Sequence, residues 1–134
     1  MSPPFVLRVT TWGIAGILAL LNIVHLAYGL PRLRGRIALG EVSASLATPF
    51  LAAWLHAGLA GLAFSALLFV AAPDLAAGSL LARRIVITVS LALIAVGAGM
   101  FALARKHPGL LVIALFGIVL LVPLIVFRAH FHAR

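Results

Sequence analysis

The chain has 134 residues, of which 65% are hydrophobic and only 9% are charged, and its formal net charge is +8. A soluble domain carries about a quarter charged residues, so this composition excludes a soluble globular protein. The basic residues stand singly or in small groups at the ends of apolar runs, which is typical of arginines that meet lipid phosphates and not nucleic acid. Because the sequence has no cysteine, disulfides, thiolate metal sites and iron–sulfur clusters are excluded as well.

Four apolar runs fill most of the sequence, and each approaches the ~20 residues that a helix needs to cross a bilayer. Inside lipid the backbone must satisfy its own hydrogen bonds, so runs of this length predict helices. We therefore expect an all-α fold, a single domain over residues 1–134 in which four transmembrane helices form an antiparallel bundle. We expect it to reside in a bacterial inner membrane. The predicted spans cover approximately residues 9–30, 49–72, 85–104 and 109–127.

The first run is interpreted as a retained span and not as a cleaved signal peptide, because it stays apolar beyond a typical signal core. Trp12 and Tyr28 lie near its two ends, where amphipathic rings favour the membrane interface. Gly29, Leu30 and Pro31 are expected to end this helix, since proline cannot continue the backbone ladder.

The boundaries of the second and third spans are also predicted from proline and capping residues. Pro49 is a good first-turn residue and is expected to begin the second span. Pro73 and Asp74 are expected to close it, with Asp74 capping a short surface helix that ends at Arg83 and Arg84. A tight turn at residue 108 predicts that the last two spans are antiparallel neighbours.

Orientation cannot be assigned from the positive-inside rule, because five lysine or arginine residues fall on each predicted side. This tie favours one alternative function, a small dimeric transporter or channel with dual topology, although the lack of a deep acidic residue argues against proton coupling. The two groups are Arg8, Arg83, Arg84, Arg128 and Arg134 on one side, and Arg32, Arg34, Arg36, Arg105 and Lys106 on the other.

Polar residues within the spans are costly and are the first candidates for function. Asn22, His25 and Tyr28 lie along one face of the first span, and Trp54 and His56 lie in the second. His25 is predicted ~8 Å and His56 ~10 Å below the same interface. Matching depth on adjacent antiparallel helices is what a bis-histidine b-type haem requires, so His25 and His56 are candidate haem ligands. The alternative is structural, with both histidines forming interhelical hydrogen bonds.

Small residues recur every fourth position in the second span, which favours close approach of another helix. This stripe consists of Ala53, Ala57, Gly61 and Ser65, and a similar run in the third span consists of Ala95, Gly99 and Ala102. The sequence leaves open whether they pack within one chain or between chains.

No catalytic constellation is recognisable, so we expect a small non-catalytic membrane protein whose immediate partner is the lipid bilayer. It would work as a subunit of a larger membrane complex or as a homo-oligomer. A haem-binding redox anchor and a dimeric transporter or channel are the alternatives, and no nucleic-acid partner is expected.

Overall fold

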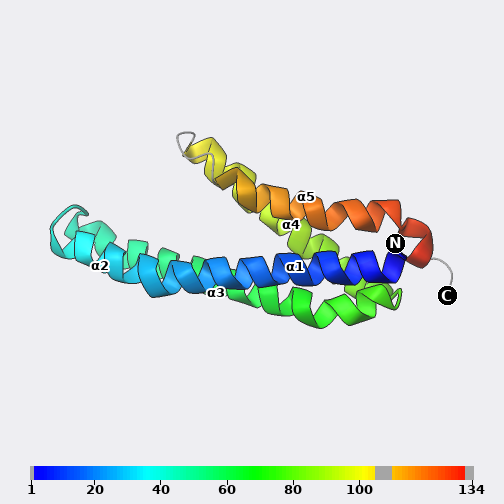
Figure 1. Cartoon of the computed structure of the whole chain (residues 1–134). Helices are drawn as coiled ribbons and strands as arrows, with labels where there is room; N and C mark the ends of the chain where they lie inside the picture. The colour runs from blue at the N-terminus through cyan, green and yellow to red at the C-terminus, as the bar shows by residue number, and fades with distance from the viewer. Residues whose placement is uncertain (1, 105–109, 132–134) are drawn as a thin grey trace. The chain divides into compact units, whose positions relative to one another are not determined.

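A computed structural model of the chain describes residues 2–104 and 110–131 (Figure 1). These residues are almost entirely helical and contain no strand, so the all-α prediction is confirmed. The helices are α1 (Pro3–Val24), the π-helical segment η1 (His25–Gly29), α2 (Leu30–Ala38), α3 (Ala44–Ala76), α4 (Leu80–Leu103), α5 (Leu111–Val126) and the short 3₁₀ segment η3 (Arg128–Phe131).

Three helices are long and apolar enough to cross a membrane: the continuous helix Pro3–Ala38 with 36 residues, α3 with 33 and α4 with 24. Only 17% of the most apolar stretch of the first is buried within the molecule, and 28% in each of the other two. Such exposed apolar surface is stable in lipid and not in water. Membrane insertion by three helices is therefore indicated, and a fourth crossing by α5, with 16 residues, stays a prediction.

The chain divides into two compact units, which are described separately. The hairpin unit comprises residues 16–66 and the terminal unit comprises residues 1–15 with 67–134. In the hairpin unit the first helix runs antiparallel to α3, because Asn22 meets Gly61 while Gly29 meets Trp54. Residue numbers that rise on one helix as they fall on the other define this direction.

In the terminal unit α4 and α5 lie side by side and antiparallel (Figure 1). Their crossing is built on glycine: a Cβ added to Gly97 would lie 2.9 Å from the Cα of Ala114, and Gly117 lies against Ser90 and Ile94. The Ser90 hydroxyl donates to the Val86 carbonyl at 2.6 Å, so this buried polar group is satisfied within its own helix. The backbones thus approach closely without a polar link between the helices.

The prediction that the first helix ends at Gly29–Pro31 is wrong, because the helix continues through η1 and α2 to Ala38. Pro31 has no N–H and cannot take part in the ladder. It follows a π-helical segment, where the regular i to i−4 bonding is already interrupted. The π-helical interruption and the missing N–H of Pro31 therefore lie close together, and the helix continues past both.

Helix α3 extends beyond the predicted second span at both ends, from Ala44 to Ala76, and contains both Pro49 and Pro73. The membrane limits of the span, residues 49–72, stay a prediction. Each proline removes one backbone bond, whereas unwinding the helix in lipid would leave several groups unsatisfied. Gly78 takes the left-handed φ of 87° that forms the turn after α3.

The short surface helix predicted before the third span does not form. Ser79 caps α4 directly, accepting a hydrogen bond from the Ala82 backbone N–H at 3.3 Å, whereas Asp74 belongs to α3. Arg83 and Arg84 consequently lie near the start of α4 and not at the end of a separate element. The predicted turn at residue 108 and the cations at 105 and 106 lie outside the described residues.

Candidate functional site

A paired histidine and tryptophan form the most elaborate polar contact of the hairpin unit. The rings of His25 and Trp54 stack with centroids 4.3 Å apart and planes 9° apart. The His25 Nε2 donates to the Trp54 carbonyl at 3.2 Å, and the Trp54 Nε1 donates to the His25 carbonyl at 3.4 Å. The two residues therefore connect the helices by stacking and by reciprocal hydrogen bonds, which suits the interhelical role weighed for His25.

Glycines on both helices make room for this contact. A Cβ on Gly29 would lie 2.8 Å from the Trp54 ring, and one on Gly58 would lie 3.2 Å from the imidazole of His25. Three residues further along α3, Gly61 lies directly against the Asn22 side chain, whose Nδ2 donates to the Leu18 carbonyl at 2.8 Å. Asn22 therefore packs across the hairpin while it hydrogen-bonds within its own helix.

The π-helical segment η1 begins at His25 and ends at Gly29, so it carries both the imidazole and the glycine that faces Trp54. Single-turn π segments occur frequently at functional sites. This segment was not predicted from the sequence. Pro31 was its available signal, because a proline within an apolar run marks a place where the ladder must be broken.

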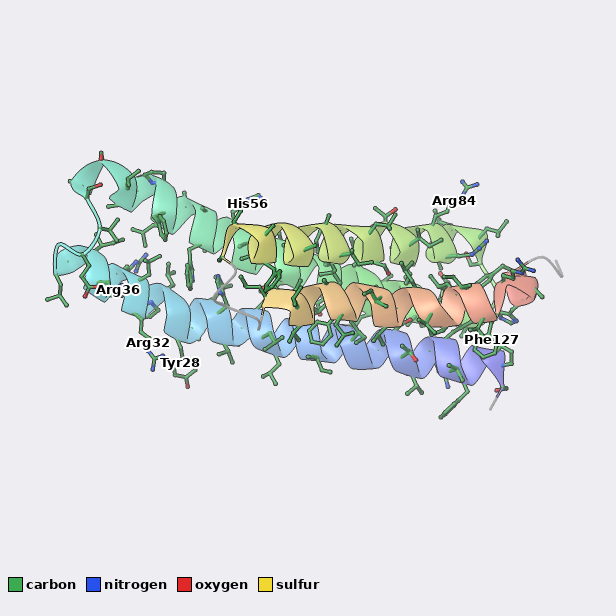
Figure 2. The ribbon with its side chains drawn as sticks, turned by 90° about the horizontal axis from the view of Figure 1, so that it is seen from above. Tyr28, Arg32, Arg36, His56, Arg84 and Phe127 are labelled. Carbon is green, nitrogen blue, oxygen red and sulfur yellow. The ribbon has the colours of Figure 1, made fainter. Side chains whose placement is uncertain are left out.

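The two candidate haem ligands lie at a similar level but face different directions. His25 packs against Trp54 and Gly58, which stand two residues before and two residues after His56. Two residues correspond to about 200° around a helix, so His56 faces away from the hairpin partner and is exposed (Figure 2). The structure does not bring the two imidazoles together within one chain.

The hydrogen bonding of His25 also bears on ligation. Its Nε2 carries the proton that is donated to Trp54, so in the neutral ring only Nδ1 keeps a lone pair for iron. Tyr28, 65% exposed, points outward on the other side of the hairpin (Figure 2). Asn22, His25 and Trp54 thus form one locus, whereas Tyr28 and His56 lie outside it.

The small-residue stripe of α3 divides in the same way. Gly61 packs against Asn22 and Ser65 is buried, but Ala53 and Ala57 are exposed. A strict four-residue spacing drifts by about 40° at every step around an α-helix. Between Ser65 and Ala53 the stripe therefore turns away from the face that packs against the first helix. Gly58 and Trp54 occupy that face instead.

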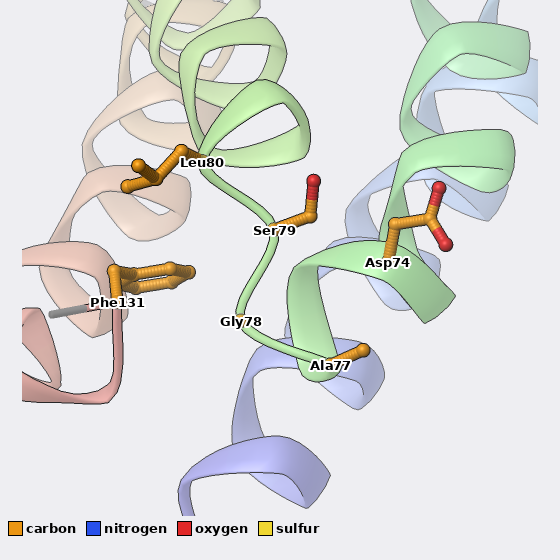
Figure 3. Close-up of a pocket in the computed structure, with 6 residues that line it drawn as sticks. All are labelled: Asp74, Ala77, Gly78, Ser79, Leu80 and Phe131. Carbon is orange, nitrogen blue, oxygen red and sulfur yellow. The ribbon is translucent and has the colours of Figure 1, made fainter. Parts of the chain in front are cut away.

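A separate open hollow of about 340 Å³ lies where α3 turns into α4 in the terminal unit (Figure 3). The C-terminal segment is anchored beside it, because the His130 Nε2 donates to the Ala76 carbonyl at 3.0 Å and the Arg83 guanidinium lies 5.2 Å from the Phe131 ring centre. Asp74 on its rim is exposed. The lining residues are Asp74, Ala77, Gly78, Ser79, Leu80 and Phe131.

Comparison with protein-family models, with curated proteins and with solved structures finds no match to this chain.

Proposed function

We propose that this chain is a small, non-catalytic integral membrane protein that crosses the bilayer four times and self-associates through the outer face of α3. The face is defined by His56 and the alanines that lie within about 60° of it around the helix, Ala52, Ala53 and Ala60. Low burial of the apolar helices supports the membrane part of the proposal. The exposed imidazole is the observation that carries the association.

An imidazole that faces lipid is costly unless another group takes up its hydrogen bonds. His56 is exposed and forms no hydrogen bond within the part of the chain that the structure describes. With the second span as predicted, it lies ~10 Å below the interface. A neutral imidazole donates one hydrogen bond and accepts one, so two copies of His56 can share an N–H···N hydrogen bond across the contact.

The residues beside His56 suit a close helix contact. Ala52 and Ala53 are exposed and stand four and three residues before it, within about 60° of it around α3. Without a hydrophobic effect to join helices in lipid, association depends on backbones that approach closely and on hydrogen bonds between them. The outer face of α3 offers both features together.

The test measures the oligomeric state of purified protein in mild detergent by light scattering, and in bilayers by single-molecule photobleaching. His56→Leu keeps a large side chain and removes the hydrogen bonds, and Ala53→Leu blocks close approach. Both are expected to shift the protein from oligomer to monomer. The matched control is Ala66→Leu, which enlarges an exposed alanine of the same helix about 140° around the helix from Ala53 and ~20 Å further along it.

A wild-type protein that is monomeric in bilayers, or an oligomer that withstands both substitutions, would refute self-association through this face. Recovery of a stoichiometric larger partner, lost in the same two variants, would replace the second copy by another subunit. The haem anchor and the dimeric transporter stay predictions, since no contact among residues 2–104 and 110–131 favours either.

A further inference from the structure

The first helix is longer than a bilayer requires. Its 36 residues from Pro3 to Ala38 extend ~54 Å at 1.5 Å per residue, compared with ~30 Å for the hydrocarbon core and ~40–45 Å with the headgroup regions. The last part, α2, changes in character, because Leu33 is buried while three arginines are exposed. The helix therefore brings three guanidinium groups, on different sides of α2, to the level of the lipid headgroups.

Two of these three charges are not neutralised. Arg36 donates to Glu41 at 2.6 Å in an exposed ion pair. Arg32 and Arg34 form no ion pair with any residue that the structure describes. Glu41 is the only carboxylate side chain of the hairpin unit, since the other acidic residue of the sequence is Asp74. The surface of α2 therefore carries a net positive charge that calls for external anions.

The surroundings of the arginines favour a lipid surface over a soluble acidic partner. Leu39, Leu46 and Phe50, close to α2 in the sequence, are 79%, 55% and 51% exposed. Tyr28 lies one turn before Arg32 and points to the same side of the helix (Figure 2). Exposed apolar groups, an outward tyrosine and arginines are the combination found where hydrocarbon meets headgroups.

We propose that α2 binds the phosphates of anionic phospholipids through Arg32 and Arg34, with Tyr28 at the hydrocarbon boundary beneath them. The arginine stems lie along apolar surface while the guanidinium groups donate to phosphate oxygens. This inference requires membrane insertion but not self-association through His56.

The experiment follows local lipid composition by fluorescence quenching. Trp12→Phe leaves Trp54, which packs against Gly29 just before α2, as the single tryptophan. This protein is placed in bilayers of phosphatidylglycerol and phosphatidylcholine in fixed proportion, with bromine on the acyl chains of one lipid or the other. The ratio of the two quenching values reports which lipid is enriched beside Trp54.

We expect stronger quenching by brominated phosphatidylglycerol. Each arginine near an anionic surface contributes ~1 kcal/mol, about a fivefold change in relative affinity. Arg32→Gln and Arg34→Gln together should therefore lower the preference by about tenfold or more, and added salt should lower it too. The matched control, Arg84→Gln with Arg128→Gln, removes the same charge from exposed positions of the terminal unit and should leave it unchanged.

Equal quenching by the two brominated lipids would refute the proposal. So would equal loss in the two double variants, since the effect would then follow net charge and not α2. The measurement is repeated with His56→Leu, which should retain the lipid preference. A protein that loses association but keeps the preference separates this inference from the proposed self-association.

Discussion

The two units join their helices by different means. In the terminal unit, α4 and α5 meet through Gly97 and Gly117, and the buried Ser90 hydroxyl is satisfied inside α4. In the hairpin unit, His25 and Trp54 stack and exchange hydrogen bonds across the helix pair. The first contact depends on the absence of side chains and the second on the presence of large polar ones.

This difference shows what each contact tolerates. A contact between backbones leaves no room for added atoms, because any added atom meets main chain. Removing a ring instead costs its stacking and hydrogen bonds together with the cavity that it leaves. The hairpin contact uses hydrogen-bonding side chains and lies at a π-helical interruption of the first helix. The glycine crossing has neither feature. We therefore expect the terminal unit to be the more sensitive to added volume and the hairpin unit to depend on specific side-chain pairs.

The largest effect is expected from adding one methyl group to the glycine crossing. The Cβ of Gly97→Ala would lie 2.9 Å from the Cα and Cβ of Ala114, so helix α4 or α5 must move. We expect a loss of about 3 kcal/mol in the free energy of unfolding, measured by denaturant titration with circular dichroism in detergent micelles.

Gly99→Ala is the matched control for this prediction. Gly99 stands two residues away in α4, is exposed, and has no atom within 4 Å of an added Cβ. Replacing glycine by alanine in an open helix position should stabilise the protein by up to about 1 kcal/mol. Equal effects of the two substitutions would contradict a close crossing at Gly97.

The corresponding glycine of the hairpin unit should behave differently because it faces a side chain. A Cβ on Gly61 would overlap the amide of Asn22, and we expect Gly61→Ala to cost about 2 kcal/mol. Asn22→Ala should remove the obstacle, so that the double variant is no less stable than Asn22→Ala alone. A coupling energy of about 2 kcal/mol in the double-mutant cycle is expected, and strictly additive effects would show that the two residues do not touch.

The sequence predicted the helices themselves well, because run length and the cost of unpaired backbone groups in lipid leave few other structures. It predicted their ends poorly. Pro31 was interpreted as the end of the first helix but lies inside Pro3–Ala38, and α3 continues past Pro49 and Pro73, which were interpreted as limits of the second span. Where a helix ends in water, solvent satisfies the backbone groups that are freed, but lipid cannot do so. Proline is therefore a weaker helix-stop signal in a membrane helix than in a soluble protein.

The candidate site was predictable in part. Counting residues from the interface brought His25 to the level of His56, and the structure agrees with that level. Depth follows from rise per residue alone, whereas direction depends on how each helix is rotated about its axis. The rotation is set by Trp54 and Gly58, whose contacts involve residues about 30 positions away in the sequence, and no local pattern encodes it.

The two histidines should accordingly differ in their effect on stability. His25→Ala removes the stack with Trp54 and the bond to its carbonyl, so we expect a loss of about 1–2 kcal/mol. His56→Ala should change the stability of the monomer by less than about 0.5 kcal/mol, since its side chain is exposed. Similar losses, or a low-spin haem spectrum abolished by either substitution, would contradict the rotation of α3 described above.

The smallest effect on stability, with an opposite effect on lipid binding, is expected from Glu41→Gln. The ion pair with Arg36 is exposed, with side chains 68% and 43% accessible, so its loss should cost well under 1 kcal/mol. The substitution nevertheless releases a third guanidinium at the headgroup level. The preference for phosphatidylglycerol beside Trp54 should therefore rise by up to about fivefold. Asp74→Asn, which removes the exposed carboxylate of the terminal unit, should leave that preference unchanged. If both acidic substitutions raise it equally, the membrane responds to total charge, and α2 has no special part in binding anionic lipid.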